Sequence, residues 1–300
     1  MLRKLAVHYL QGMLMGGADV IPGVSGGTMA LIVGIYVRLV DTISDLFAVA
    51  VNLIRFNFPE ARRRFMEVEW SLILPLGLGI GTAILLGAQV ILTLMENYPE
   101  EMRGLFFGLV AASIALPWVR IGKVTPQLVV IALVGAIIAF FLVGLPFLEV
   151  QDPSLIRVFF SASFAICAMI LPGISGAFIL HTMGMYEPTL TALNNREILY
   201  VLVFIAGAGI GLGLFSTLLD WLLENYHDRT MAALVGLMAG SLRAIWPWMG
   251  EGRGLRWPGD GDPVAVVVLL LLAGFAFVSF LTWLGARKLE QQGQRAPQTS

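Results

Sequence analysis

Residues 16–28, GGADVIPGVSGGT, place glycines, a proline, two hydroxyl residues and an aspartate inside an otherwise apolar stretch. Gly and Pro lower helix stability, and a charged side chain is costly in lipid, so this composition does not suit an ordinary membrane helix. Free backbone N–H groups at a helix start, hydroxyl side chains and glycine backbone are groups that bind anions such as phosphate. The segment therefore predicts a broken helix whose break binds an anion.

The motif occurs twice along the chain. IPGVSGGTMALIVGIY at 21–36 aligns with LPGISGAFILHTMGMY at 171–186, at a constant offset of 150 residues. Three downstream matches follow in the same order, namely GIG at 79–81 and 209–211, ENY at 96–98 and 224–226, and GLVAAS at 108–113 with GLMAGS at 236–241. Shared low complexity does not produce this order of residue types, so the sequence predicts a duplication. The predicted units are residues 1–150 and 151–290, followed by a disordered tail at 291–300.

Both copies of the motif are predicted to bind phosphate, with Pro22 and Pro172 breaking the helices. The predicted ligands supply backbone donors, close approach or hydroxyl groups, and they are Gly23, Ser25, Gly26, Gly27, Thr28, Gly173, Ser175 and Gly176. The alternative is that these small residues only allow close helix packing, which is common in membranes. Packing is the favoured interpretation for Gly34 and Gly184, whereas the repeated Pro and Ser favour a function.

Asp19 lies shortly before the first motif, and its counterpart in the second copy is Met169. The two breaks are therefore chemically unequal. Asp is a good helix cap, which is the structural interpretation. An acid at membrane depth is also a functional candidate, and a proton-binding role in coupling is predicted for Asp19.

Four further residues are candidates for coupling or gating. Arg38 and Glu187 follow the two motifs at nearly equivalent points, and either function or interfacial anchoring explains them. His181, after the second motif, is suited to donating to phosphate or to bridging helices. Arg243, close to Trp246, is interpreted first as a snorkelling side chain and second as a phosphate ligand.

The composition places the chain among polytopic membrane proteins, since 58% of its 300 residues are apolar and 13% are charged. The formal net charge of −1 offers no basic face for nucleic acid. A single cysteine, Cys167, excludes an internal disulfide, and three scattered histidines disfavour a metal centre. No metal or cofactor is therefore predicted.

Hydropathy predicts about three membrane-spanning segments in each unit, because roughly 20 apolar residues are needed to cross a bilayer. They lie near 71–95, 103–120, 127–147, 199–223, 230–248 and 263–285. The leading segment of each unit, near 5–35 and 155–186, is long but interrupted by its Pro-Gly motif. Such a segment either crosses once as a broken helix or turns back as a re-entrant hairpin.

The distribution of charge favours the hairpin, because cytoplasmic loops collect Lys and Arg. With re-entrant hairpins, the basic stretches at residues 3–4, 55–64, 120–123 and 287–295 all fall on the cytoplasmic side, and GEGRGLR at 250–256 is a mildly basic exception outside. Each unit then crosses the membrane an odd number of times. The prediction is an all-α polytopic membrane protein with two inverted repeats, each a re-entrant helical hairpin plus about three transmembrane helices.

The paired motifs GGADVIPGVSGGTMALIVGIY and LPGISGAFILHTMGMYEP resemble the bacterial polyprenyl-phosphate transporter family over nearly the whole chain. The resemblance implies a non-enzymatic flippase that returns undecaprenyl phosphate, the lipid carrier of cell-wall sugars, to the inner leaflet for recycling. It also implies the bacterial cytoplasmic membrane as location, and the distribution of Lys and Arg places both termini in the cytoplasm. Inverted repeats with broken helices are typical of ion-coupled transporters.

Two other functions are weighed against a flippase. A small-anion channel or exchanger would use the same helix breaks, and a cavity open sideways to lipid would favour the flippase. A membrane lipid phosphatase would need clustered histidines with basic residues, which the chain lacks. The coupling ion, the exact lipid and the formation of a homo-oligomer are left open.

Overall fold

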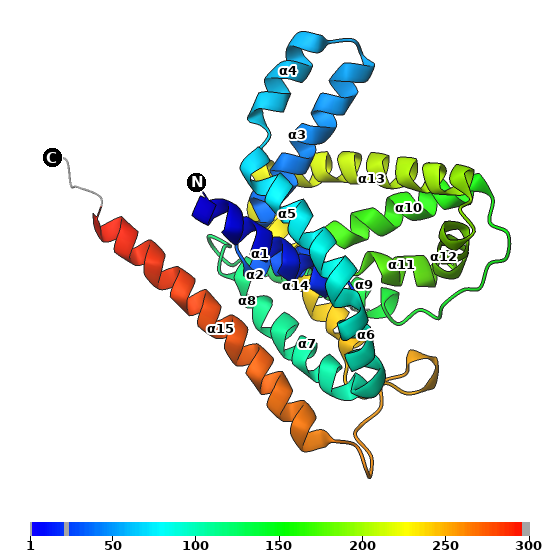
Figure 1. The fold of residues 1–300 in the computed structure, drawn as a ribbon. Helices are drawn as coiled ribbons and strands as arrows, with labels where there is room; N and C mark the ends of the chain where they lie inside the picture. The colour runs from blue at the N-terminus through cyan, green and yellow to red at the C-terminus, as the bar shows by residue number, and fades with distance from the viewer. Residues whose placement is uncertain (1, 21–23, 296–300) are drawn as a thin grey trace.

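The computed structural model describes residues 2–20 and 24–295, which form a bundle of helices (Figure 1). The first half contains α1 (Leu2–Asp19), α2 (Gly26–Ile32), α3 (Tyr36–Ile54), α4 (Phe58–Glu67), α5 (Trp70–Thr82), the π-helical turn η1 (Ala83–Gly87), α6 (Ala88–Asn97), α7 (Pro99–Ser113), α8 (Ala115–Trp118) and α9 (Pro126–Leu142). The second half contains α10 (Leu155–Ile170), α11 (Gly176–Thr182), α12 (Tyr186–Asn194), α13 (Ile198–Asn225), α14 (His227–Ser241), the 3₁₀ turns η2 (Leu242–Ile245) and η3 (Glu251–Arg253), and α15 (Val264–Arg295). The predicted tail thus begins inside α15, and its residues 296–300 lie outside the described part.

Three helical stretches of the described chain are long and apolar enough to cross a membrane, namely Trp70–Gly87, Ile198–Asn225 and Val264–Trp283. The apolar helices α9 and α10 are shorter. Large apolar side chains stand exposed on the outer faces of the long helices, including Leu78 at 68%, Leu214 at 60% and Leu269 at 66% exposure. Such continuous apolar surface fits contact with lipid tails, and the protein is an all-helical membrane protein.

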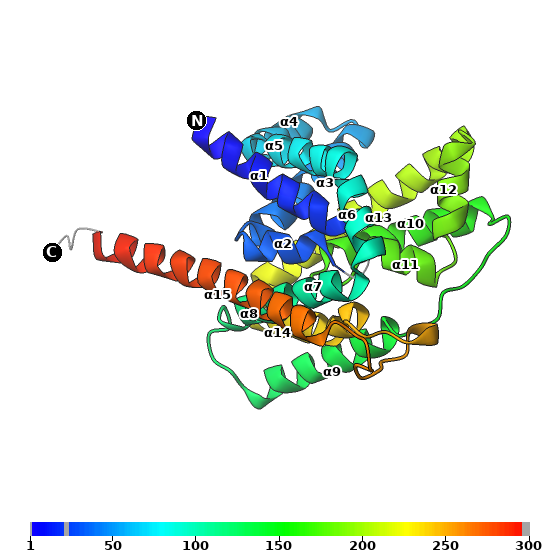
Figure 2. The same ribbon diagram turned by 60° about the horizontal axis from the view of Figure 1, so that its bottom comes forward.

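The helices pack in four extensive pairs. α1 packs on α5 in the first half and α10 on α13 in the second, whereas α7 packs on α15 and α14 on α9 across the halves. Figure 2 shows α15 along α7 and α9 beside α14. Glycines permit the close contact, since a Cβ on Gly108 would overlap the backbone of Leu271, and one on Gly236 that of Ala132.

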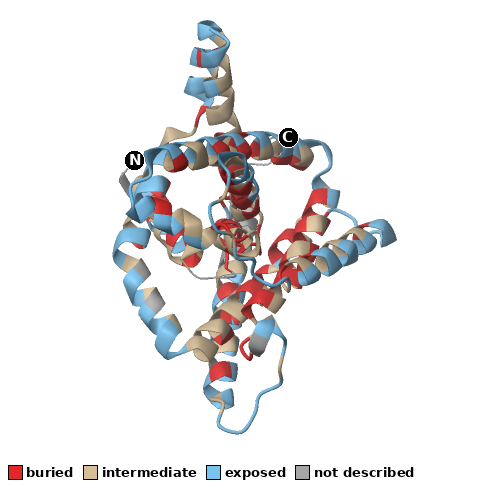
Figure 3. Cartoon of the chain, turned by 90° about the vertical axis from the view of Figure 1, so that its right-hand side faces the viewer, coloured by how far each residue is buried: buried red, intermediate tan, exposed pale blue. Residues whose placement is uncertain are grey.

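Each Pro-Gly motif separates two helices at the centre of the molecule. The first break joins α1 to α2 through residues 20–25, of which Ile21, Pro22 and Gly23 lie outside the described residues. The second break, residues 171–175, joins α10 to α11, and its Gly173 has φ +90°, a conformation that favours glycine. Buried residues gather in this central region, while the outer helix faces are exposed (Figure 3).

Candidate functional site

The two helix breaks contact each other directly. The Ser25 hydroxyl lies 3.1 Å from the carbonyl oxygens of both Met169 and Leu171 at the end of α10, and it shares its hydrogen between them. The same oxygen accepts the N–H of Gly27 at 3.1 Å, which makes Ser25 the N-cap of α2. A residue predicted to bind phosphate thus also connects the two breaks.

Thr28 makes the reciprocal connection, because its hydroxyl accepts the N–H of Gly173 at 2.9 Å. The approach is close enough that a Cβ on Gly27 would overlap the Ile170 carbonyl. Gly176 is similarly confined by the Ala165 carbonyl. In this conformation, polar groups of the two breaks therefore satisfy one another.

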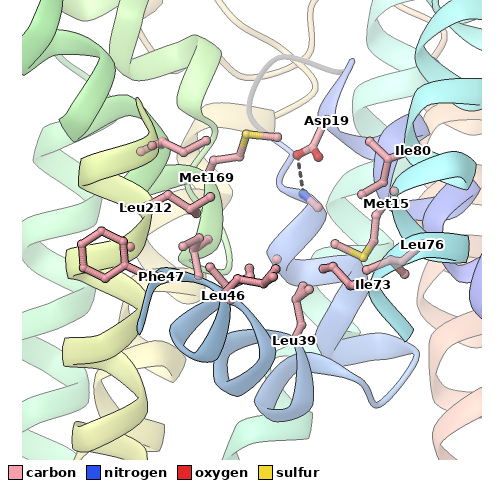
Figure 4. A pocket seen from close by; sticks show the side chains of 18 of the residues that line it. Met15, Asp19, Leu39, Leu46, Phe47, Ile73, Leu76, Ile80, Met169 and Leu212 are labelled. Atoms are coloured by element: carbon pink, nitrogen blue, oxygen red, sulfur yellow. Dashed lines mark hydrogen bonds between the residues drawn. The ribbon is translucent and has the colours of Figure 1, made fainter. Parts of the chain in front are cut away.

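Asp19 ends α1 and faces the start of α2. Its carboxylate Oδ1 accepts the N–H of Gly26 at 2.6 Å, so the predicted capping contact is present. The carboxylate also lines a cavity, where it lies among apolar side chains (Figure 4). An anion that reaches the Gly26 N–H would have to displace this carboxylate.

The cavity beside Asp19 has a volume of about 500 Å³, and we call it the acid cavity. Its walls come from α1, α3, α5, α10 and α13 and are almost wholly apolar, including Met15, Leu46, Ile73, Leu76, Met169 and Leu212 (Figure 4). The polar end is formed by Asp19 with Gly26 and Gly27. The acid cavity is therefore amphipathic, with one polar end and a long apolar wall.

Tyr36 was not among the predicted site residues, yet it lines the acid cavity. Tyr36 is 1% exposed, and its hydroxyl has no hydrogen-bond partner within residues 2–20 and 24–295. A buried hydroxyl without a partner is costly, so the Tyr36 hydroxyl is a donor that a polar group inside the acid cavity could satisfy. Its alignment with Tyr186 in the sequence repeat was the available signal.

The remaining predicted residues lie in three different places. Arg38 forms an ion pair with Glu69 at the surface, away from the acid cavity. Glu187 is exposed at the start of α12. Pro172 and Ser175 are buried in the second break, where Ser175 occupies the N-cap position of α11 without a side-chain capping bond.

His181 and Arg243 lie beyond the second break. The His181 ring stacks on Tyr186 with ring centroids 3.8 Å apart, and on Phe147 at 4.7 Å. Arg243 donates to the Phe140 carbonyl at 3.1 Å and lies over that residue's ring. Neither side chain lines the acid cavity. Among the described residues, no group of three His, Cys, Asp or Glu side chains is placed to hold a metal ion.

Residues 15–255 match the family described as VCA0040-like, undecaprenyl phosphate translocase-like. The chain belongs to this family. Among its relatives, a protein of Vibrio cholerae serotype O1 (strain ATCC 39315 / El Tor Inaba N16961) is 40% identical over 261 residues, covering 86% of this chain and 83% of the relative. A protein of Staphylococcus aureus (strain NCTC 8325 / PS 47) is 27% identical over 258 residues, covering 80% and 86%.

Both relatives are named polyprenyl-phosphate transporter. The family resemblance read from the paired motifs is confirmed, and the chain is a member of a transporter family and not an enzyme. No solved structure matches the chain significantly.

Proposed function

We propose that this protein transports polyprenyl phosphate across the bacterial cytoplasmic membrane and returns the lipid carrier to the inner leaflet for recycling. The observation that carries the proposal is the acid cavity, because a polyprenyl phosphate is itself a polar headgroup on a long apolar chain. The names of both relatives support the same substrate. An apolar wall gives little stabilisation to a free hydrated anion, which disfavours the small-anion channel or exchanger.

In the proposed complex, the phosphate lies at the polar end of the acid cavity and the first isoprene units lie along its apolar wall. The cavity volume of about 500 Å³ is too small for a long polyprenyl lipid, so the rest of the chain stays in the bilayer. Gly26 and Gly27 supply backbone donors at this end, and the Tyr36 hydroxyl is a further donor in the cavity lining. At the two breaks, Gly23, Ser25, Thr28, Gly173, Ser175 and Gly176 remain the proposed phosphate ligands when the breaks separate.

We propose that protonation of Asp19 couples transport to the proton gradient. The ionised carboxylate holds the Gly26 N–H and repels phosphate, whereas the neutral acid is a weaker acceptor and leaves that donor free. Phosphate binds with the proton, and loss of the proton on the cytoplasmic side lets Asp19 regain Gly26 and release the lipid. An inward proton gradient then drives the headgroup inward.

The pairing of helices supports an internal repeat of the structure. In the sequence repeat, α1 with α5 corresponds to α10 with α13, and α7 with α15 corresponds to α14 with α9, so the same contacts recur after exchange of the halves. We propose that the two hairpins enter from opposite faces and that both termini lie in the cytoplasm. Such reciprocal halves suit alternating access to a central site.

Cysteine labelling tests this orientation. In a Cys167→Ser background, cysteines at Arg62 and Lys123 are expected to react only after the membrane is permeabilised, whereas those at Glu101 and Gln151 react with an impermeant reagent in intact cells. Arg62 lies within α4, Glu101 in the first turn of α7, and Lys123 and Gln151 in connections, and all four positions are outside the candidate spans. Labelling of Arg62 from outside would overturn the inverted arrangement.

Transport itself is tested with purified protein in proteoliposomes. A fluorescent polyprenyl phosphate is expected to cross the bilayer faster than in protein-free vesicles, since the protein supplies a path for the charged headgroup. The matched polyprenol, which lacks phosphate, is expected to show no protein-dependent acceleration. Equal acceleration of both lipids would show scrambling and contradict the proposal, and phosphate efflux without lipid movement would support an anion channel.

A further inference from the structure

A second cavity, of about 570 Å³, lies between α7, α11, η2 and the segment that precedes α15. We call it the arginine cavity, because Arg103 and Arg253 line it together with His181. Phe147 and Phe178 form part of its wall. Its lining is thus cationic and aromatic, unlike that of the acid cavity.

The two arginines of this cavity have no ion-pair partner among the described side chains. Arg256, on the same connection, shows the contrast, since it pairs with Glu100 at 2.7 Å and with Asp262. The Glu100 carboxylate attracts the charge of Arg103 electrostatically, but it forms its ion pair with Arg256. The arginine cavity therefore carries two positive charges without a direct ion-pair partner among the described side chains.

The Arg253 guanidinium contacts two aromatic rings of the cavity wall. This guanidinium lies 4.6 Å from the ring centre of Phe147 and 4.5 Å from that of Phe178, while the Nε of Arg253 is buried without an acceptor among the described side chains. Its φ of 64° is unusual for a residue with a side chain and requires support from its surroundings. Burial, with the charges of Arg103 and Arg243, lowers the pKa of Arg253 to about 10, so it stays charged at neutral pH.

The sequence repeat shows what the fold needs at this place. The positions of Arg103 and His181 are taken in the other half by Met231 and Leu31, and that of Ala244 by Leu116. Those three residues are buried in one continuous apolar core. The equivalent place in the first half is therefore a packed apolar core, and folding alone does not account for Arg103 and His181 at a cavity.

The connection that supplies Arg253 is also specific to the second half. Residues 246–263 join η2 to α15, whereas the equivalent connection between α8 and α9 is only residues 119–125. The added length brings Arg253 over the aromatic wall. Arg103 and Arg253 thus come from distant segments to one place.

Helix α11 links the arginine cavity to the helix breaks. Its N-cap is Ser175 in the second break, and His181, in its last turn, lies about 9 Å further along at 1.5 Å per residue. Met169 and Ile170, just before the second break, line the acid cavity. The acid cavity is thus lined by the helix that enters the second break, and the arginine cavity by the helix that leaves it.

We propose that the arginine cavity is a second phosphate site, in which Arg103 and Arg253 bind a phosphomonoester before it reaches the acid cavity. The inference rests on the proposed transport of polyprenyl phosphate and names the site that loads the headgroup. Guanidinium groups form paired, charge-assisted hydrogen bonds with phosphate, and the aromatic wall suits the adjoining isoprene unit. The shared chemistry is a phosphate dianion, carried either by the lipid or as free phosphate.

Protection of the arginines from phenylglyoxal gives a readout specific to this cavity. Full-length protein in nanodiscs is treated with the reagent, and peptide mass spectrometry measures the modification of each arginine. Farnesyl phosphate is expected to protect Arg103 and Arg253 but not Arg196, which is exposed in the connection between α12 and α13. Farnesol, which lacks phosphate, is expected to protect neither arginine. If inorganic phosphate protects both arginines as well as farnesyl phosphate does, the site binds free phosphate.

Substitutions supply the energetic test. Arg103→Gln and Arg253→Gln are each expected to weaken farnesyl phosphate binding by about tenfold, because each removes a charge-assisted bond. Arg253→Lys should recover part of the affinity, and Arg196→Gln should bind like the unmodified protein. Matching melting temperatures establish that the variants are folded.

Failure of this inference is distinguishable from failure of the proposed transport. Unprotected arginines and unchanged binding in the double variant would overturn the arginine site, even if the unmodified protein flips polyprenyl phosphate normally. Protection of Arg103 and Arg253 in a protein that flips no lipid would instead support the site and reject the proposed transport.

Discussion

Asp19→Asn is expected to bind polyprenyl phosphate and to lose the response of transport to a proton gradient. The Asn side-chain oxygen still accepts the Gly26 N–H, so the start of α2 keeps its contact. Asn carries no exchangeable charge, however, and it no longer ties release of phosphate to release of a proton. At one proton per lipid, a difference of one pH unit supports at most about a tenfold transbilayer ratio, which should fall to about one.

The measurement is the distribution of labelled polyprenyl phosphate in proteoliposomes with and without an imposed pH difference. Asp228→Asn is the matched control, because Asp228 also accepts a glycine N–H, from Gly122 at 3.2 Å, but lies away from the acid cavity. The control should accumulate lipid like the unmodified protein. If Asp19→Asn does so too, Asp19 serves only as a cap, and another group or ion provides the coupling.

Gly79→Ala is expected to destabilise the protein strongly, whereas Gly81→Ala on the same helix is not. A Cβ on Gly79 would overlap the Tyr9 carbonyl and come within 2.9 Å of the Met13 nitrogen, so α5 and α1 would have to separate. Such overpacking typically costs about 1 to 3 kcal/mol. A Cβ on Gly81 meets open space, and Ala favours the helix by about 1 kcal/mol over Gly.

Thermal unfolding in one detergent compares the two variants directly. The melting temperature of Gly79→Ala should drop clearly, and that of Gly81→Ala should stay or rise. The second half allows an independent repetition, since Gly211 packs against Ser163 while Gly209 is open. Equal melting temperatures for all four variants would contradict the packing described for α1 with α5 and α10 with α13.

These glycines illustrate how far the sequence leads. The repeat of GIG at 79–81 and 209–211 reveals the duplication, and hydropathy locates the helices that carry it. The triplet itself does not tell which of its glycines contacts the neighbouring helix. In the first half it is the first glycine, Gly79, and in the second half it is the last, Gly211. That choice depends on the rotation of each helix against its partner.

The candidate site was likewise only partly predictable. Local patterns identify Asp19 and the two breaks, because the residue composition around each Pro-Gly motif and the spacing of the two motifs are enough to find them. The apolar wall of the acid cavity comes from α3, α5 and α13, and only tertiary contact brings these segments together. Arg253 was hidden in GEGRGLR, which stood out only as an exception in the charge pattern.

The hydrogen bonds between the two breaks also bear on energy conservation in the cell. Ser25 and Thr28 occupy backbone groups of the opposite break, which leaves those groups unavailable to a file of water molecules. A continuous water file through the centre would conduct protons and dissipate the membrane potential between transport events. Opening the path requires several bonds to break together, at about 0.5 to 1.5 kcal/mol each. We therefore expect these bonds to slow proton leakage in this conformation, through the same residues that are proposed to receive the lipid phosphate.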